Sequence, residues 1–257
     1  MQPNVLSIAG SDPSGGAGVQ ADLKTFNALG VYGMAVITAL TAQNTQGVSG
    51  VYDVSAGFVK DQLKAVFDDI RVDAVKIGML ARADIVEVVA DVLDYYQPEH
   101  IVLDPVMVAT SGDALIDQSA LEVMKERLFP LSSIITPNIP EAEKILRKVV
   151  MNQEQSAQAL LEQGSRAVLL KGGHLKGEII YDALSFAGGL KVFELPRVDT
   201  ENTHGTGCTL SAAIAVYLAK GEGMEQACWN AKQYVHQCLL RADDLSVGQS
   251  NGPLCHG

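Results

Sequence analysis

Short apolar runs alternate with amphipathic helical segments along almost the whole chain, and this alternation constrains the fold more than any other feature. Apolar runs of strand length occur at 5–9, 74–77, 101–103 and 167–170. Strands that are apolar on both faces and separated by helices are typical of a mostly parallel sheet covered on both sides. The sequence therefore predicts an α/β protein with three αβα layers around a mostly parallel central sheet.

The remaining segments fit one domain. The chain has no Pro/Ser-rich linker, charge block or fixed-period repeat, so we expect a single domain over 1–257 with frayed residues at 248–257. Further strands are expected at 36–39 and 48–54 and as a hairpin near 178–185 and 191–195; helices are expected at 17–29, 56–68, 83–95, 119–128, 140–146, 153–163, 207–219 and 224–241.

Composition excludes several classes of function. Nineteen basic and thirty acidic residues give a formal charge of −11, which argues against nucleic-acid or anionic-membrane binding as the main activity. No stretch reaches the roughly 18 apolar residues of a membrane span, and no basic segment precedes the first apolar run, so we expect no secretory signal. The four cysteines form no C-x-x-C pair, which favours reduced thiols and a cytoplasmic location.

Polar side chains follow the expected strands at several places. Asp12, Gln43, Asp104, Asn138 and Lys171 each come after a strand. In open α/β sheets, ligands bind outside the carboxyl ends of the strands. The shared location predicts a ligand crevice there, with ordinary loop polarity as the alternative.

Two glycines, Gly205 and Gly207, open a helix of small residues. The backbone amides of a first helical turn are unpaired, and with the helix dipole they form an anion site. The alternative is a glycine-rich helix start that packs closely on the sheet. Cys208 lies inside this turn, where the dipole is expected to lower its thiol pKa; otherwise it is a small buried residue. We expect a contact in phosphoryl transfer, or a weak base, rather than a covalent nucleophile.

Oxygen ligands for a metal follow two strands. Asp104 ends a strand, and Asn138 and Glu141 lie at a helix start with the spacing that makes both face one way. Mg²⁺ usually takes only one or two carboxylates and keeps waters. The alternative is a capping box made by Asn138 and Glu141. Lys171, next to two glycines, suits a phosphate counter-ion or is a solvated surface lysine, and the polar stretch at 108–115 is either a lid or a plain loop.

The first loop carries an incomplete nucleotide motif. Residues 16–21 match G-x-G-x-x-A, but the acidic residue expected about 20 positions later is missing from 39–45, and no P-loop motif is present. An NAD-binding Rossmann oxidoreductase is therefore only a weak alternative. Asp22 falls on the apolar side of the expected helix and needs a partner: a polar ligand, a backbone amide or a basic side chain.

Together these residues resemble the ribokinase-like small-molecule kinases, and most closely the hydroxymethylpyrimidine/phosphomethylpyrimidine kinases of thiamine biosynthesis. The likeness runs from Ala9 to about Arg241, and the set in this order is highly specific although no single motif is. The matching motifs are AGSDPSGGAG at 9–18, QADLK at 20–24, TALTAQNT at 38–45, KIGML at 76–80, DPVM at 104–107, TPN at 136–138 with Glu141, KGGH at 171–174 and THGTGCT at 203–209.

The resemblance implies transfer of phosphate from ATP, with Mg²⁺, to 4-amino-5-hydroxymethyl-2-methylpyrimidine and then to its monophosphate. It implies that Asp22 and Gln43 bind the aminopyrimidine and that Gly10, Met79 and Val106 line its pocket. Its catalytic set is Gly205, Gly207, Cys208, Lys171 and Asp104, its phosphate contacts are Lys171, Thr206 and Gly207, and its metal ligands are Asp104, Asn138 and Glu141. Many ribokinase-like enzymes have an aspartate base where this chain has Cys208, a substitution that the pyrimidine kinases share.

Other functions remain open at the level of sequence. A pyridoxal/pyridoxine kinase of the same fold is the nearest alternative, because its substrate also carries a hydroxymethyl group. A non-catalytic ligand-binding module is a further one. The resemblance also implies a homodimer, since related kinases are often dimers, and a small-molecule substrate as the partner.

Overall fold

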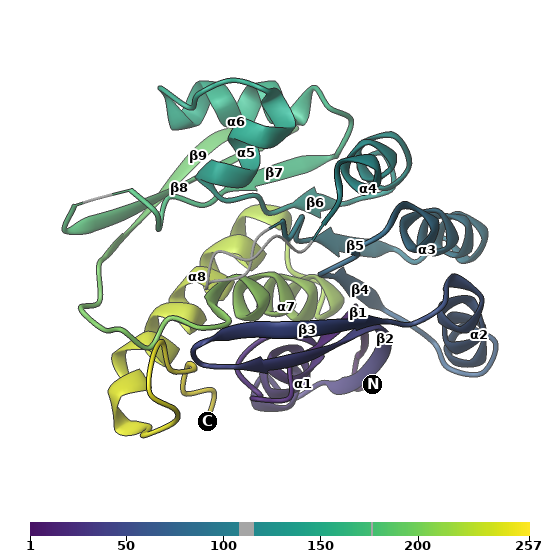
Figure 1. Cartoon of the computed structure of the whole chain (residues 1–257). Coiled ribbons are helices and arrows are strands. Elements are labelled where there is room, and N and C mark those ends of the chain that lie inside the picture. The colour runs from purple at the N-terminus through teal and green to yellow at the C-terminus, as the bar shows by residue number, and fades with distance from the viewer. Residues whose placement is uncertain (108–115, 176) are drawn as a thin grey trace.

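The computed structural model describes residues 1–107, 116–175 and 177–257. The expected lid at 108–115 lies outside these residues. Nine strands form one sheet in the order β3-β2-β1-β4-β5-β6-β7-β8-β9, with helices on both faces (Figure 1). The predicted three-layer α/β architecture is therefore confirmed.

The centre of the sheet is parallel and both edges are antiparallel. Strands β1, β2, β4, β5, β6 and β7 pair in parallel, whereas β3 pairs antiparallel with β2, and β8 with both β7 and β9. The strands are β1 (Asn4–Ser11), β2 (Tyr32–Asn44), β3 (Gly47–Asp53), β4 (Ala74–Ile77), β5 (His100–Leu103), β6 (Ile134–Ile135), β7 (Ala167–Leu170), β8 (Ile179–Phe186) and β9 (Gly189–Pro196).

The helices divide between the two faces because each packs an apolar side on the sheet. Two buried clusters result, one on each face, and Leu6 and Val5 of β1 point into different clusters. One layer holds α2 (Ala56–Phe67), α3 (Ala83–Tyr96), α4 (Gln118–Val123), α5 (Ile139–Leu146) and α6 (Gln153–Leu161); the other holds α1 (Gly18–Ala28), α7 (Thr206–Ala219) and α8 (Met224–Leu240).

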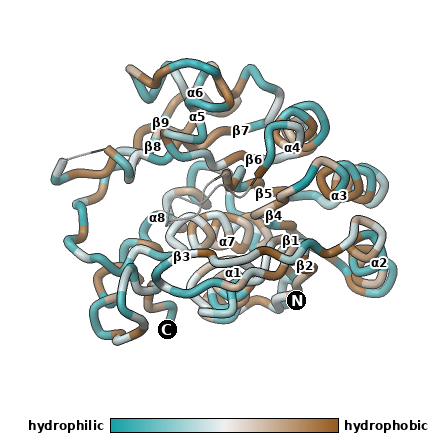
Figure 2. Tube along the Cα trace, in the orientation of Figure 1, coloured by the Kyte–Doolittle hydropathy of each residue, from teal (hydrophilic) through white to brown (hydrophobic). Residues whose placement is uncertain are grey.

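Helix α7 lies at the centre of its layer. It is apolar on all sides, as expected of a helix that neighbours enclose, and it contacts β1, β4, β5, α1 and α8. Figure 2 shows apolar residues along the central strands and more polar ones on the outer helices. The central strands and α1 therefore fix the position of the α7 N-terminus.

Part of the segment predicted to be frayed is packed, because residues 252–254 are buried whereas residues 248–250 are exposed. Leu254 is buried, and Pro253 forms a bridge with His204 beside the start of α7. The Nε2 atom of His256 lies 3.0 Å from the Thr209 hydroxyl oxygen. The apolar contact of Leu254 and these polar contacts hold the segment in place, although its Gly-rich sequence indicates flexibility.

Two other elements differ in extent. The expected helix at 119–128 divides into α4 and a π-helical turn, Met124–Leu128. Strand β2 is longer than the apolar run at 36–39, because it extends into a ribbon with β3 that projects beyond the parallel strands. Among the helices of the described residues, none is long and apolar enough to cross a membrane.

Candidate active site

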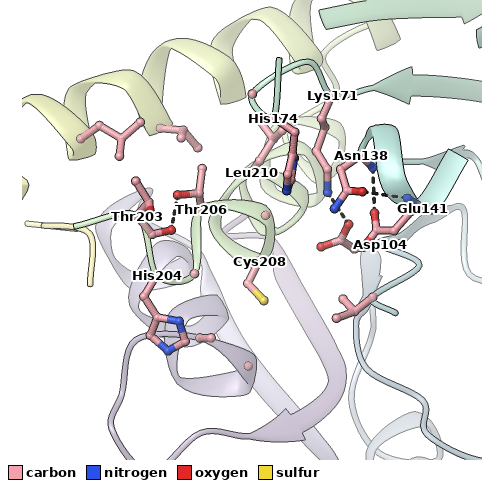
Figure 3. A pocket seen from close by; sticks show the side chains of 18 of the residues that line it. Asp104, Asn138, Glu141, Lys171, His174, Thr203, His204, Thr206, Cys208 and Leu210 are labelled. Atoms are coloured by element: carbon pink, nitrogen blue, oxygen red, sulfur yellow. Dashed lines mark hydrogen bonds and ion pairs between the residues drawn. The ribbon is translucent and has the colours of Figure 1, made fainter. Parts of the chain in front are cut away.

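A cavity of about 620 Å³ opens at the carboxyl ends of the parallel strands. Residues that follow β1, β4, β5, β6 and β7 all contribute to its lining. Strand β1 pairs in parallel with both β2 and β4, so the chain leaves the sheet centre in opposite directions, which creates a crevice. The volume lies within the usual range for small-molecule sites, and Figure 3 shows the side chains that line it.

The N-terminal tip of α7 forms one wall of the cavity. Gly205 precedes the helix with φ at +84°, and a Cβ atom there would lie 1.8 Å from the Gly16 carbonyl oxygen. Only glycine fits this contact, which presses the helix tip against the first loop. Thr206, Gly207 and Cys208 line the cavity with the first helical turn. The Thr206 hydroxyl donates to the Thr203 carbonyl at 2.6 Å.

Lys171 and Asp104 face this helix tip. A Cβ atom on Gly207 would lie 3.4 Å from both Asp104 Oδ2 and Lys171 Nζ. Lys171 Nζ in turn lies 2.8 Å from Asp104 Oδ1 (Figure 3). The structure thus brings the unpaired amides, an ammonium group and a carboxylate to one place, which is an arrangement suited to a phosphate with a cation.

Hydrogen bonds with Thr136 and Pro137 hold the Lys171–Asp104 pair in position. The Thr136 hydroxyl donates to Asp104 Oδ1 at 2.9 Å, and the Lys171 amide donates to the Pro137 carbonyl. Burial by itself lowers the pKa of Lys171, but Asp104 and Glu141 outweigh burial and raise it. Lys171 therefore carries its positive charge at neutral pH, in the place where a phosphate would bind.

Asn138 and Glu141 form the capping box that was one of the two interpretations of their spacing. Asn138 Oδ1 accepts from the Glu141 amide at 2.9 Å, and Glu141 Oε2 accepts from the Asn138 amide at 2.7 Å. Both residues also line the cavity. Burial raises the pKa of Glu141 to about 7; Lys171 opposes this effect and Asp104 adds to it. The cap does not exclude a role towards a cation.

The donor set of Asp104, Glu141 and Asn138 fits a weakly held Mg²⁺. Within the described residues no group of three or more His, Cys, Asp or Glu side chains is placed to hold a metal. Mg²⁺ characteristically binds through one or two carboxylates and completes its sphere with water and substrate phosphates. Two carboxylates and an amide oxygen beside a phosphate site meet that requirement.

Cys208 differs in one respect from the prediction. Burial raises the pKa of its thiol, and although Lys76 opposes this, Asp22 and Asp104 raise it further. The expected lowering by the helix dipole is therefore wrong, because desolvation outweighs the dipole. Cys208 lines the cavity as a neutral thiol, which agrees with a contact or weak base and not with a thiolate nucleophile.

Four of the five expected substrate residues line the opposite part of the cavity: Gly10, Gln43, Met79 and Val106. A Cβ atom on Gly10 would lie 3.2 Å from Met79 Sδ, so a side chain there would press on the cavity wall. The Thr41 hydroxyl donates to Gln43 Oε1 at 3.1 Å and holds that amide in place. These residues contribute apolar surface and one side-chain amide to the lining of the cavity.

Asp22 is the expected residue that does not reach the cavity. It is fully buried, and its carboxylate oxygens both lie 2.9 Å from Lys76 Nζ, while Oδ2 also accepts from the Ser7 hydroxyl at 2.6 Å. The basic side chain that was one possible partner is therefore the one observed. The expected hydrogen bond from Asp22 to a substrate is corrected: the carboxylate binds Lys76 and Ser7 and does not line the cavity.

Sequence reasoning missed three sets of residues. Lys76 lines the cavity from the interior of β4, where a lysine in an apolar strand was a usable signal. His204 Nε2 donates to Asp12 Oδ2 at 2.8 Å and joins the first loop to the start of α7. Asp182 and Lys232 form a buried pair at the far end of the cavity and belong to no motif.

Comparison with known proteins identifies the family to which the chain belongs. Residues 12–255 match the sequence profile of the phosphomethylpyrimidine kinase family. A hydroxymethylpyrimidine/phosphomethylpyrimidine kinase of Escherichia coli is 51% identical, with 98% of this chain and 97% of the relative covered. A crystal structure of phosphomethylpyrimidine kinase from Clostridium difficile superposes with a TM-score of 0.82 at 45% identity, covering 92% of this chain and 99% of that one.

A pyridoxal kinase of Bacillus subtilis, crystallised as an ADP complex, is also similar. Its TM-score is 0.89 at 35% identity, with 100% of this chain and 98% of that chain covered. The fold and the site thus define a ribokinase-like small-molecule kinase with ATP as phosphate donor. Within that class, the chain belongs to the phosphomethylpyrimidine kinase family.

The space in front of Gly207 generates a prediction. Gly207→Ala should lower kcat by about tenfold or more, because the new methyl group enters the gap between the helix tip, Asp104 and Lys171. The melting temperature should not fall, since alanine favours the helix. Gly57→Ala is the matched control: Gly57 lies in α2 with no atom within 4 Å of its added Cβ. Equal kcat values for Gly207→Ala and Gly57→Ala would show that the helix tip takes no part in the reaction.

The Asp12–His204 contact generates a prediction about acid stability. Burial by itself raises the pKa of Asp12, but hydrogen bonds from His204 and Ser14 outweigh it and lower the pKa to about 2. The folded-state pKa is below the unfolded value of about 3.9, so the stabilisation is present above that value and is lost as the pH falls towards 2.

Asp12→Asn should therefore lower the free energy of unfolding by about 1–2 kcal/mol near neutral pH, and the difference from wild type should narrow in acid. Urea titrations across this pH range measure it. Asp61→Asn, on the exposed face of α2, is the control and should show no such trend. A difference that stays constant with pH would show that the Asp12 charge contributes nothing.

Proposed function

We propose that this protein transfers the γ-phosphoryl group of ATP to 4-amino-5-hydroxymethyl-2-methylpyrimidine, and then transfers a second to the monophosphate, in thiamine biosynthesis. The observation that carries the proposal is the α7 tip that faces Lys171 and Asp104 inside a cavity that Gln43 and Met79 also line. The Escherichia coli relative, with 51% identity, bears the name of this activity.

Different residues of the cavity lining bind the acceptor and the nucleotide. Gly10, Met79 and Val106 hold the pyrimidine ring, and the Gln43 amide orients it by hydrogen bonding to its polar edge. Apolar side chains at the other end, among them Leu210, Val235 and Leu239, suit a purine ring. The transferred phosphoryl group then lies between the two ligands, at the helix tip.

Charge stabilisation and positioning account for the chemistry. The amides of Gly205–Cys208 and the Lys171 ammonium stabilise the charge on the phosphoryl oxygens as it develops. A loose phosphoryl-transfer transition state needs little help from a base, so a neutral Cys208 thiol beside the acceptor hydroxyl is sufficient. When bound, Mg²⁺ would neutralise phosphate charge, and Asp104, Glu141 and Asn138 are the residues that would hold it.

A pyridoxal kinase activity is the second candidate. The Bacillus subtilis pyridoxal kinase has the same fold at a TM-score of 0.89, although its identity of 35% is lower than the 51% of the pyrimidine kinase relative. Both acceptors present a flat ring with a hydroxymethyl group. The two reactions share the phosphate end of the cavity and differ only at the end of Gln43 and Met79.

A turnover assay with ATP and Mg²⁺ separates the two acceptors. We expect the pyrimidine alcohol to yield first a monophosphate and then a diphosphate, resolved by mass, with a kcat/KM well above that for pyridoxal. Lys171→Met should remove turnover of both acceptors, because it deletes the phosphate counter-ion. Preferred turnover of pyridoxal, or a product that stops at the monophosphate, would contradict the proposal.

We also infer a homodimer formed through the β2–β3 ribbon, and a cytoplasmic location. Strand β3 is an edge strand, and Leu40, Val51 and Tyr52 on the ribbon are exposed at 44%, 47% and 71%, which suits cover by a second copy. Light scattering should give twice the chain mass, and Tyr52→Glu should give the monomer; a monomeric wild type would oppose the inference.

Four free thiols and the need for ATP support a cytoplasmic location, which cell fractionation checks.

A further inference from the structure

Asp182 and Lys232 form a buried ion pair in the lining of the cavity, and the proposed reaction assigns them no step. We propose that Asp182, with Lys232 as its counter-ion, is a positioning residue for Lys171. The proposal rests on the proposed function only in that the cavity binds the phosphates of a nucleotide; it does not depend on which alcohol is the acceptor.

The contacts run directly from this pair to the phosphate-binding turn. Lys232 of α8 lies 2.5 Å from Asp182 Oδ2 through its Nζ atom, and both side chains are only 7% exposed. The other carboxylate oxygen, Oδ1, accepts from the Gly172 amide at 2.8 Å. One carboxylate therefore joins α8 to the residue that directly follows Lys171.

The Gly172 amide needs such an acceptor because the strand ladder has already ended. Strand β7 pairs with β8 only up to Leu170 and Ala183. Beyond that point the chain runs so close to β8 that a Cβ on Gly172 would lie 1.9 Å from the Tyr181 carbonyl oxygen. The Asp182 side chain thus supplies the hydrogen bond that a strand neighbour would otherwise accept.

Lys171 is fixed on both sides as a result. Its own amide donates to the Pro137 carbonyl, next to Asn138, and the following amide donates to Asp182. Its ammonium group then reaches Asp104 at 2.8 Å. Loss of either amide contact frees the turn to shift, and a small shift of Lys171 moves its charge away from the helix tip.

The ion pair itself is a poor source of stability. Two buried charges lose their hydration, and replacing such a pair by apolar side chains often leaves a protein equally stable. Asp182 does what an apolar residue cannot, since one carboxylate oxygen accepts from the Gly172 amide while the other pairs with Lys232. A geometric role accounts for both partners, whereas a stabilising role accounts for neither.

Two double variants test the hydrogen bond with the charge pair absent from both. Asp182→Asn with Lys232→Met retains an oxygen acceptor for the Gly172 amide, whereas Asp182→Ala with Lys232→Met does not. We expect the alanine variant to bind ADP about tenfold more weakly and to have a kcat about tenfold lower than the asparagine variant, the usual effect of one lost hydrogen bond. The KM for the acceptor should be the same in both.

The same comparison in a Lys171→Met background shows whether the effect passes through Lys171. There the two double variants should bind ADP equally, as measured by calorimetry. A difference that persists would mean that Asp182 acts elsewhere, and equal weakening of ADP and acceptor binding would mean general loosening; either result overturns the proposal. Because calorimetry with ADP needs no acceptor, it remains informative if the pyrimidine assignment fails.

Two further measurements keep the test decisive. Lys191→Met with Glu225→Ala removes an exposed pair, at 3.3 Å, and should change nothing. If the alanine double variant does not fold, the test is the ADP affinity of the asparagine double variant compared with that of the wild type. ADP affinity within about threefold of wild type supports positioning through the Gly172 hydrogen bond. A tenfold loss would show that the Lys232 charge binds the nucleotide directly and would overturn the proposal.

Discussion

The site depends on the close contact between the tip of α7 and the first loop. Gly205 approaches the Gly16 carbonyl so closely that a Cβ atom would lie 1.8 Å from it, and the added Cβ of Gly16 would meet the His204 ring at 2.2 Å. The two loops therefore interlock without room for larger side chains. This contact fixes the tip of α7 at the place where an added Cβ on Gly207 would lie 3.4 Å from Lys171 Nζ.

Three lysine–aspartate pairs, each largely shielded from solvent, contribute at least one residue to the lining of the same cavity: Asp22–Lys76, Asp104–Lys171 and Asp182–Lys232. Each partner is drawn from a different element, so each pair joins parts of the fold that are distant in sequence. Buried pairs add little net stability because desolvation opposes their attraction. Their concentration around one cavity instead keeps the charges that face a phosphate fixed before it arrives, which is the condition for electrostatic stabilisation of a transition state.

The sequence predicts what local patterns control. Apolar strands and helical spacing predict the three layers, and the polar residues after the strands meet at one edge because parallel strands end there. Such local patterns do not identify ion-pair partners that are distant in the sequence. Lys76 lies 54 positions from Asp22 and Lys232 lies 50 from Asp182, so the sequence shows only that Asp22 needs a partner. The predicted lowering of the Cys208 thiol pKa is wrong, because burial raises this pKa and the burial of the thiol depends on the whole fold.

The division of the cavity explains why related folds serve different acceptors. In the proposed reaction the helix tip, Lys171 and Asp104 contact only phosphate and cation, so they do not distinguish the rings that carry the hydroxyl group. On that proposal, discrimination comes from the groups that contact the ring, chiefly the partly buried Gln43 amide, because an amide that the wrong ring covers and leaves unpaired costs binding energy. Similarity of fold to a pyridoxal kinase therefore says much about the phosphate end and little about the acceptor. In the proposed reaction it is therefore the groups at Gln43 and Met79 that distinguish one alcohol from another.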